Sequence, residues 1–186
     1  MGGVKRYVLT GTPGAGKTAI ALELEARGYA VVPEAATDVI ACAQASGIDE
    51  RLGGPDFVDD IVALQRRRQE APVAPGVTVQ IYDRSPICTL ALARYAGLPV
   101  SRLLAAEVDR VLRAAVYERR AFFVRSIGFV TPTAARRITY EQSLRFEQIH
   151  EQVYRECGFA LVDIPPAPVP DRVAMVTSYL GATLAG

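Results

Sequence analysis

The 186-residue sequence contains little cysteine, a single histidine and no tryptophan, and its charges almost cancel. Cys42, Cys88 and Cys157 are far apart, and with His150 as the single histidine no Cys/His zinc cage can be assembled. The net charge of +1 provides no overall field to hold a nucleic acid or an anionic membrane. Nucleic acid is therefore disfavoured as a partner unless a local patch supplies the charge.

The sequence also lacks a long apolar run. Its 50% hydrophobic and 22% charged residues are typical of a globular protein. No stretch reaches the roughly 20 apolar residues of a membrane-spanning helix, and no cleavable apolar segment follows the basic N-terminus. Few, scattered cysteines fit a reducing compartment. We expect a cytoplasmic protein without a membrane partner, folded as one domain over residues 1–186.

Lysine is scarce as well, since only two of the 21 basic residues, Lys5 and Lys17, are lysines. Lys17 belongs to a stretch that fits the P-loop (Walker A) pattern G-x-x-x-x-G-K-[ST], made of Gly11, Thr12, Pro13, Gly14, Ala15, Gly16, Lys17 and Thr18. In this pattern backbone N–H groups converge on phosphate, the lysine contacts the β- and γ-phosphates, and the last hydroxyl binds Mg²⁺. Residues 11–18 therefore predict a binding site for ATP and Mg²⁺.

Short apolar runs alternate with segments of helical periodicity along the chain. We expect strands over residues 4–10, 29–33, 77–83, 121–126 and 159–164, and helices over residues 16–28, 35–46, 55–70, 87–96, 101–119, 140–157 and 171–180. This alternation predicts an α/β fold of three layers, with helices on both faces of a five-stranded parallel sheet. Ligands of such sheets bind at the carboxyl ends of the strands.

The third expected strand ends in a polar residue, Asp83, and Arg84 follows it directly. An acid at this place can bind Mg²⁺ together with Thr18, although Asp83 could instead cap a helix that starts near Pro86. Arg84 can donate a pair of hydrogen bonds to a phosphate or an anionic acceptor, or it can pair with a surface acid. Glu34, after the second strand, can accept a hydroxyl proton or be a solvated acid at a helix start.

The P-loop and the polar residues that follow the strands are distributed over nearly the whole chain. After the P-loop come Glu34, the triplet Asp83-Arg84-Ser85, an arginine-bearing loop and the last strand. The sequence in this respect resembles the AAA-type ATP-binding domain of small P-loop kinases. Within that group it is similar to the nicotinamide-riboside-kinase-like and deoxynucleoside-kinase-like branches, and the latter carry an acid-Arg-Ser triplet at the corresponding place.

The resemblance implies a strand order of 2-3-1-4-5 and a small lid at about residues 126–140. It implies that Glu34 is the base for the acceptor hydroxyl. It also implies that Arg136 and Arg137, in the lid, stabilise the transferring phosphoryl charge, although an arginine pair is also common on a solvated face. The family often places an arginine three residues after the glutamate, where this sequence has Thr37.

The sequence thus predicts a phosphotransferase that moves the γ-phosphate of ATP, with Mg²⁺, to a hydroxyl group of a small, nucleoside-like acceptor. The catalytic candidates are Lys17, Glu34, Asp83, Arg84, Arg136 and Arg137, and the metal candidates are Thr18 and Asp83. An NTP-hydrolysing regulatory switch and a kinase of RNA or DNA ends are the alternatives. No guanine-reading Asn-Lys-x-Asp sequence is present, which argues against a Ras-like GTPase. Formation of a homodimer stays open.

Overall fold

The computed structural model describes residues 3–45, 54–127 and 139–184. Its centre is a five-stranded sheet built from β1 (Lys5–Thr10), β2 (Ala30–Val32), β3 (Val79–Asp83), β4 (Arg120–Val124) and β5 (Ala160–Ile164). All neighbouring strands are parallel, and their order is β2-β3-β1-β4-β5. This confirms the predicted fold class and the order that the family resemblance implies. The carboxyl ends of all strands consequently lie at one edge of the sheet.

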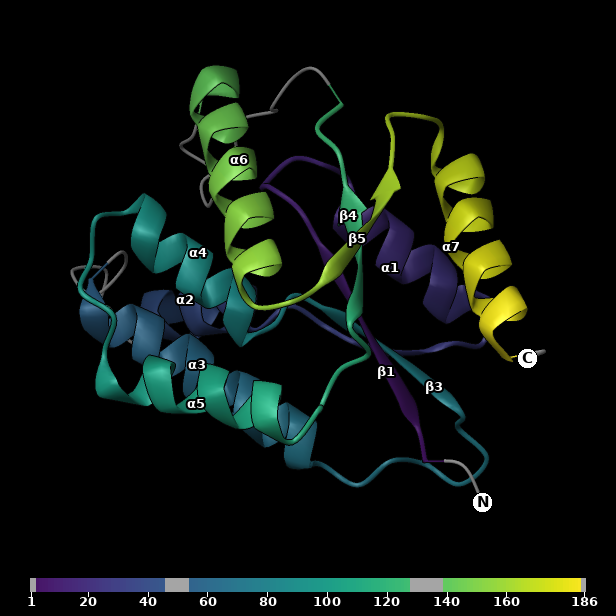
Figure 1. Ribbon diagram of the computed structural model, residues 1–186, viewed down its shortest axis with the longest axis horizontal. Coiled ribbons are helices and arrows are strands. Elements are labelled where there is room, and N and C mark those ends of the chain that lie inside the picture. The colour runs from purple at the N-terminus through teal and green to yellow at the C-terminus, as the bar shows by residue number, and fades with distance from the viewer. Residues whose placement is uncertain (1–2, 46–53, 128–138, 185–186) are drawn as a thin grey trace.

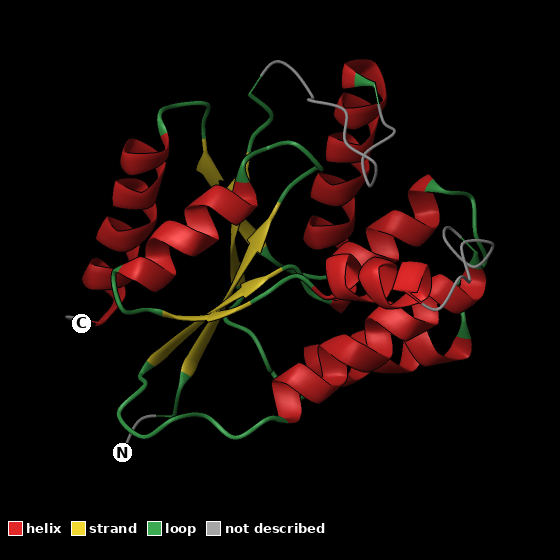
Figure 2. Ribbon diagram, turned by 180° about the vertical axis from the view of Figure 1, so that it is seen from behind, coloured by secondary structure: helices red, strands yellow, loops and turns green. Residues whose placement is uncertain are grey.

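Helices cover both faces of the sheet, as Figure 1 shows from the front and Figure 2 from behind. One face carries α1 (Lys17–Ala26) and α7 (Val169–Leu184). The other carries α3 (Pro55–Glu70), α4 (Pro86–Tyr95), α5 (Arg102–Arg113) and α6 (Tyr140–Glu156), while α2 (Ala35–Ala45) packs on α3. The crossover helices thus produce the three-layer architecture expected of parallel βαβ units.

The alternation of side chains along β1 explains how one strand serves two hydrophobic cores. Tyr7 and Leu9 point to the face covered by α1 and α7, and Val8 points to the opposite face. Ile20 of α1 and Val176 of α7 complete the first core, and both are fully buried. Each such side chain contributes roughly 1.5–3 kcal/mol through burial, so both helices are firmly attached to the sheet.

The helix boundaries differ most from the expectation in α5 and α7. The α5 helix ends at Arg113 rather than near residue 119, because Ala115 adopts a left-handed conformation (φ 46°) and the N–H of Val116 donates to the carbonyl of Val111. This hydrogen bond is the mark of a Schellman motif, which usually places glycine where Ala115 stands. The α7 helix begins at Val169 rather than at residue 171, so that it includes Pro170, and it ends at Leu184 rather than at residue 180.

The predicted lid falls mostly on residues 128–138, and Arg136 and Arg137 with it, outside the described residues. Within the described ranges, no helix combines the length and the apolar character that crossing a bilayer requires.

Candidate active site

The P-loop connects β1 to α1 at the carboxyl edge of the sheet. A Cβ atom on Gly11 (φ 131°) would lie 2.3 Å from the carbonyl oxygen of Val124, so no other residue fits there. Gly16 (φ 88°) caps α1 in a left-handed conformation, and Lys17 and Thr18 begin the helix. The first N–H groups of a helix have no partner within the helix and lie at its positive end. The loop therefore has the local geometry of an anion-binding site.

The side chain of Lys17 is 5% exposed and folds back over this loop. Its Nζ atom donates to the carbonyl oxygen of Thr12 at 2.7 Å. Burial and the nearby Arg84 lower the pKa of Lys17 to about 7, although Asp83 and Glu34 oppose this shift. The lysine is therefore close to losing its proton, and an arriving anion would favour the charged form.

Asp83, the last residue of β3, lies opposite Leu9 of β1 and so next to the P-loop. Its Oδ1 atom is buried and has no hydrogen-bond partner among the described residues, and burial raises its pKa. The interpretation of Asp83 as a helix cap is wrong, because Ser85 occupies the N-cap position of α4. The carboxylate is therefore available for another partner.

A cation suits this carboxylate. Thr18, Glu34 and Asp83 line one cavity of about 260 Å³ beside the P-loop. Hydroxyl and carboxylate oxygens are ligands that Mg²⁺ prefers, and an unpartnered buried carboxylate oxygen gains most from one. Thr18 and Asp83 therefore fit the metal role that the sequence predicts for them.

Glu34 and Arg84, from the ends of β2 and β3, form an ion pair. The Nε atom of Arg84 donates to Oε1 of Glu34, and its Nη1 atom donates to the carbonyl oxygen of Gly11 at 3.2 Å. Burial raises the pKa of Glu34, but the charges of Arg84 and Lys17 outweigh burial, so that this pKa falls below its usual value. Glu34 is consequently ionised at neutral pH. Arg84 therefore pairs with an acid, as one interpretation of the sequence expected, and that acid is the partly buried Glu34.

The backbone of Arg84 is strained. Its φ of 76° is left-handed, which costs a non-glycine residue about 1–3 kcal/mol, and its N–H donates to the carbonyl oxygen of Leu9 at 3.0 Å. The surrounding contacts must stabilise this conformation, which directs the guanidinium group at Glu34.

Further contacts support the segment that carries Glu34. The hydroxyl of Thr37 donates to Oε2 of Glu34 at 3.1 Å, from the position where the family often has arginine. Arg68 of α3 donates to the carbonyl oxygen of Pro33 at 2.8 Å and pairs with Asp38. Arg68 lies in the last turn of α3, where a cation is favourable in any helix. In the folded protein Arg68 provides a positive charge near Glu34, where the family often has an arginine and this chain has Thr37.

A larger cavity of about 630 Å³ opens from the P-loop and the Glu34–Arg84 pair toward α3, α4 and α6. Its far wall is mainly apolar, with the side chains of Ile40, Phe57, Ile61, Leu92 and Phe146. Gln65 and Thr89 are buried polar residues of this wall, 7% and 3% exposed, and the Oε1 atom of Gln65 accepts a hydrogen bond from the Thr89 hydroxyl at 3.0 Å. This bond orients the amide. No signal in the sequence distinguishes Gln65 from other helical glutamines.

A buried polar cluster, which the sequence analysis also missed, lies behind Arg84. The Tyr154 hydroxyl contacts Ser85 Oγ at 2.7 Å and Cys88 Sγ at 3.0 Å, and Cys88 contacts Thr10 Oγ1 at 3.2 Å. The cluster joins α6 to the end of β1 and to the start of α4. It therefore lies next to the strained Arg84, which directly precedes Ser85. His150, one turn earlier in α6, is fully buried, and burial together with the charges of Arg84 and Lys17 lowers its pKa. It is far from every motif in sequence but close to the site in space.

A family model described as an AAA domain matches residues 6–172 of the chain. No match was found among curated proteins. Solved structures similar to the chain include a NadR protein in complex with NAD and AMP-PNP (TM-score 0.68, 16% identity, covering 96% of this chain and 50% of that one). The chain therefore spans about half the length of that protein.

Two further similar structures are covered over their full length. They are a deoxyadenosine kinase from M. mycoides with bound dCTP (TM-score 0.63) and a thymidylate kinase from Ehrlichia chaffeensis (TM-score 0.66), each 14% identical and each covering 96% of this chain and 100% of its own. At this identity the likeness shows the fold. With the family match over most of the chain, it follows that this protein belongs to the AAA domain family and has the fold of the small P-loop kinases.

Proposed function

We propose that the protein transfers the γ-phosphoryl group of ATP to a hydroxyl group of a small, nucleoside-like molecule. The observation that carries this proposal is the cavity of about 630 Å³ that begins at Lys17 and the Glu34–Arg84 pair. Its volume lies within the range of about 300–1,000 Å³ that is usual for small-molecule sites. A regulatory switch needs no cavity of this volume beside the phosphate site.

In this proposal the N–H groups of the P-loop and the Lys17 ammonium group hold the β- and γ-phosphates. Thr18 and Asp83 would hold Mg²⁺, which supplies positive charge to the phosphate oxygens when it is bound. The low pKa of Lys17 in the free protein supports its role, because a bound polyanion restores the charged form.

Glu34 accepts a hydrogen bond from the acceptor hydroxyl and orients its oxygen toward the γ-phosphorus. As the new P–O bond forms, the bond to the β–γ bridging oxygen breaks, ADP leaves and the hydroxyl proton passes to Glu34. Phosphoryl transfer has a loose transition state, so orientation and charge stabilisation matter more than base strength. An ionised Glu34 of low pKa is therefore adequate. Arg84 would neutralise charge at the transferring group, and we assign Arg136 and Arg137 the same role.

The wall of the cavity supports a nucleoside-like acceptor. Its apolar side chains suit the faces of a flat ring, and the buried Gln65 offers an amide to a polar ring edge. Among the proteins of similar fold are a deoxyadenosine kinase and a thymidylate kinase, whose names state nucleoside and nucleotide substrates.

The substitution Glu34→Gln tests the proposal, with the exposed Glu23→Gln on α1 as the matched control. Transfer of labelled phosphate from ATP is measured against a panel of nucleosides, sugars, aminoglycoside-like compounds and RNA ends. We expect the wild type and Glu23→Gln to phosphorylate a small hydroxyl compound, and Glu34→Gln to be slower by about 10²- to 10⁴-fold with ATP affinity largely retained.

Two results would refute the proposal. One is a loss of ATP affinity in Glu34→Gln as large as the loss of transfer, because Glu34 would then act on the nucleotide. The other is ATP hydrolysis without any acceptor at a rate that no compound of the panel alters, which would indicate a switch.

A further inference from the structure

Arg172 is a buried arginine that the scheme above does not use. It lies in the first turn of α7, and it is 1% exposed. Its Nη1 atom donates to the carbonyl oxygen of Ala15 in the P-loop at 2.7 Å, and its Nη2 atom donates to the carbonyl oxygen of Arg125 at 3.0 Å. The guanidinium group thus joins the P-loop to the residue that follows β4.

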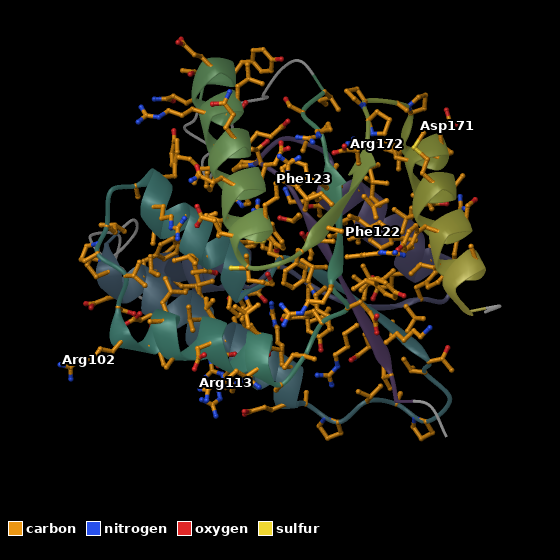
Figure 3. The ribbon with its side chains drawn as sticks, in the orientation of Figure 1. Arg102, Arg113, Phe122, Phe123, Asp171 and Arg172 are labelled. Carbon is orange, nitrogen blue, oxygen red and sulfur yellow. The ribbon has the colours of Figure 1, made fainter. Side chains whose placement is uncertain are left out.

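No carboxylate compensates this charge within the described part of the chain. Both hydrogen-bond acceptors are carbonyl groups, and Nε has no partner among the described residues. Asp171, the adjacent acid, is exposed, and Figure 3 shows it at the outer end of α7 with Arg172 on the side toward the sheet. The positive end of a helix also disfavours a cation. Folding alone gives little reason for this group, because an apolar side chain in place of a buried charge is often neutral or stabilising.

The guanidinium group packs directly against the P-loop backbone. A Cβ atom on Gly16 would lie 3.0 Å from Nη1 of Arg172. In a planar trans peptide the C=O and N–H bonds point in opposite directions, so the hydrogen bond to Ala15 O turns the N–H of Gly16 away from Arg172. Gly16 lines the large cavity, and its N–H has no backbone acceptor among the described residues. Arg172 therefore orients a free donor of the phosphate site.

We propose that Arg172 is a positioning residue for the nucleotide, which orients the Ala15–Gly16 peptide toward a phosphate group and adds an unpaired positive charge behind it. This inference rests on the proposed binding of ATP at residues 11–18. The ligand-free protein bears the unfavourable free energy of a buried, uncompensated cation, and the charge of a bound triphosphate relieves it. Nucleotide affinity and the stability of the folded protein are therefore coupled through one side chain.

The substitution Arg172→Met tests this coupling, because methionine removes the charge and the donors and stays apolar. The control is Arg102→Met on α5, an exposed arginine that Figure 3 shows on the opposite side of the molecule. Affinity for ATP with Mg²⁺ is measured by calorimetry, and melting temperature is measured with and without ATP. We expect Arg172→Met to raise the Kd for ATP about 10- to 100-fold and to lose most of the ATP-induced rise in melting temperature. The ligand-free melting temperature should stay the same or rise.

Inorganic tripolyphosphate provides a second readout, since it carries the charge of ATP without the nucleoside. It should bind Arg172→Met more weakly by a similar factor. The variant Arg172→Lys keeps the charge, but one ammonium group cannot make both fork-like hydrogen bonds. We expect its Kd for ATP to lie between those of the wild type and Arg172→Met, and it decides the question if the methionine variant does not fold.

An unchanged Kd for ATP in either variant, with a lower ligand-free melting temperature, would show that Arg172 only holds α7 in place and would overturn the inference. Failure of the proposed function is a different result, because the wild-type protein itself would then bind no ATP.

Discussion

The two ends of the large cavity are built in different ways. The phosphate end consists of one unbroken segment, residues 11–18, whose geometry follows from local backbone conformation. The acceptor end is assembled from Glu34 after β2, Arg84 after β3, Gln65 of α3 and Phe146 of α6. A contiguous site can be recognised in a sequence, whereas a distributed one becomes visible only when the sheet brings its parts together.

The two ends also differ in charge balance. At the acceptor end, Arg84 is paired with Glu34. At the phosphate end, within the part of the chain that the structure describes, the hydrogen bonds of Lys17 Nζ and of the Arg172 guanidinium group go to carbonyl groups and to no carboxylate. The phosphate end is thus prepared for a polyanion, and the acceptor end for a molecule without a strong charge.

Among the changes that compare the two ends, removal of the cation at the phosphate end should have the largest effect. In Lys17→Met we expect phosphate transfer to fall on the order of 10³-fold, because a preorganised charge next to the γ-phosphate is lost. The control is Lys5→Met, the other lysine of the chain. Initial rates with saturating ATP measure the effect, and a variant that keeps a tenth of the activity or more would remove Lys17 from the mechanism.

Rising pH should weaken ATP binding at the same end. Lys17 has a pKa of about 7 in the free protein, and a bound triphosphate raises it, so binding above pH 7 takes up a proton. Affinity should therefore fall by up to about tenfold per pH unit as pH rises above 7. Calorimetry in buffers of different ionisation enthalpy measures the proton uptake. In Lys17→Arg, whose side chain stays charged, the dependence should disappear, and its persistence would assign it to another group.

A substitution at the acceptor end should not change the binding of ATP. In Gln65→Leu we expect the KM for the best acceptor of the panel to rise about tenfold, because a hydrogen bond to the acceptor is lost, while the KM for ATP stays constant. The exposed Gln152→Leu of α6 is the control. Equal changes in both KM values would mean that the two ends are not independent.

The smallest effect is expected from the cluster behind Arg84. Tyr154→Phe removes one hydroxyl group from contact with Ser85 and Cys88, which should lower the free energy of unfolding by about 1–3 kcal/mol. The cluster lies next to the strained Arg84, so loss of the hydroxyl group should also disturb the position of Arg84. We therefore expect kcat to fall a few-fold, because a small misplacement of a catalytic group slows the reaction. Urea unfolding and steady-state rates measure both, with the exposed Tyr140→Phe as control. A loss of stability without any change of kcat would make the cluster purely structural.

Much of the fold could be predicted from the sequence. Apolar runs and helical periodicity placed the strands and helices to within a few residues, since burial on a parallel sheet demands those patterns. The boundary of α5 could not be predicted, because Ala115 adopts a left-handed conformation that alanine rarely takes. The same limit applies to Arg84, whose backbone strain depends on contacts from β1 and not on its neighbours in the chain.

By itself, the sequence determined the P-loop, because its glycines, lysine and threonine specify their geometry through local backbone freedom and the start of a helix. It also determined that Asp83 ends one strand and Glu34 follows another, so that both lie at the ligand edge. Only the tertiary structure decided that Glu34 pairs with Arg84, that Gln65 faces the cavity and that Arg172 reaches the P-loop from α7. Those contacts join residues far apart in the chain, and their energies depend on burial and on neighbouring charges, which exist only after the chain has folded.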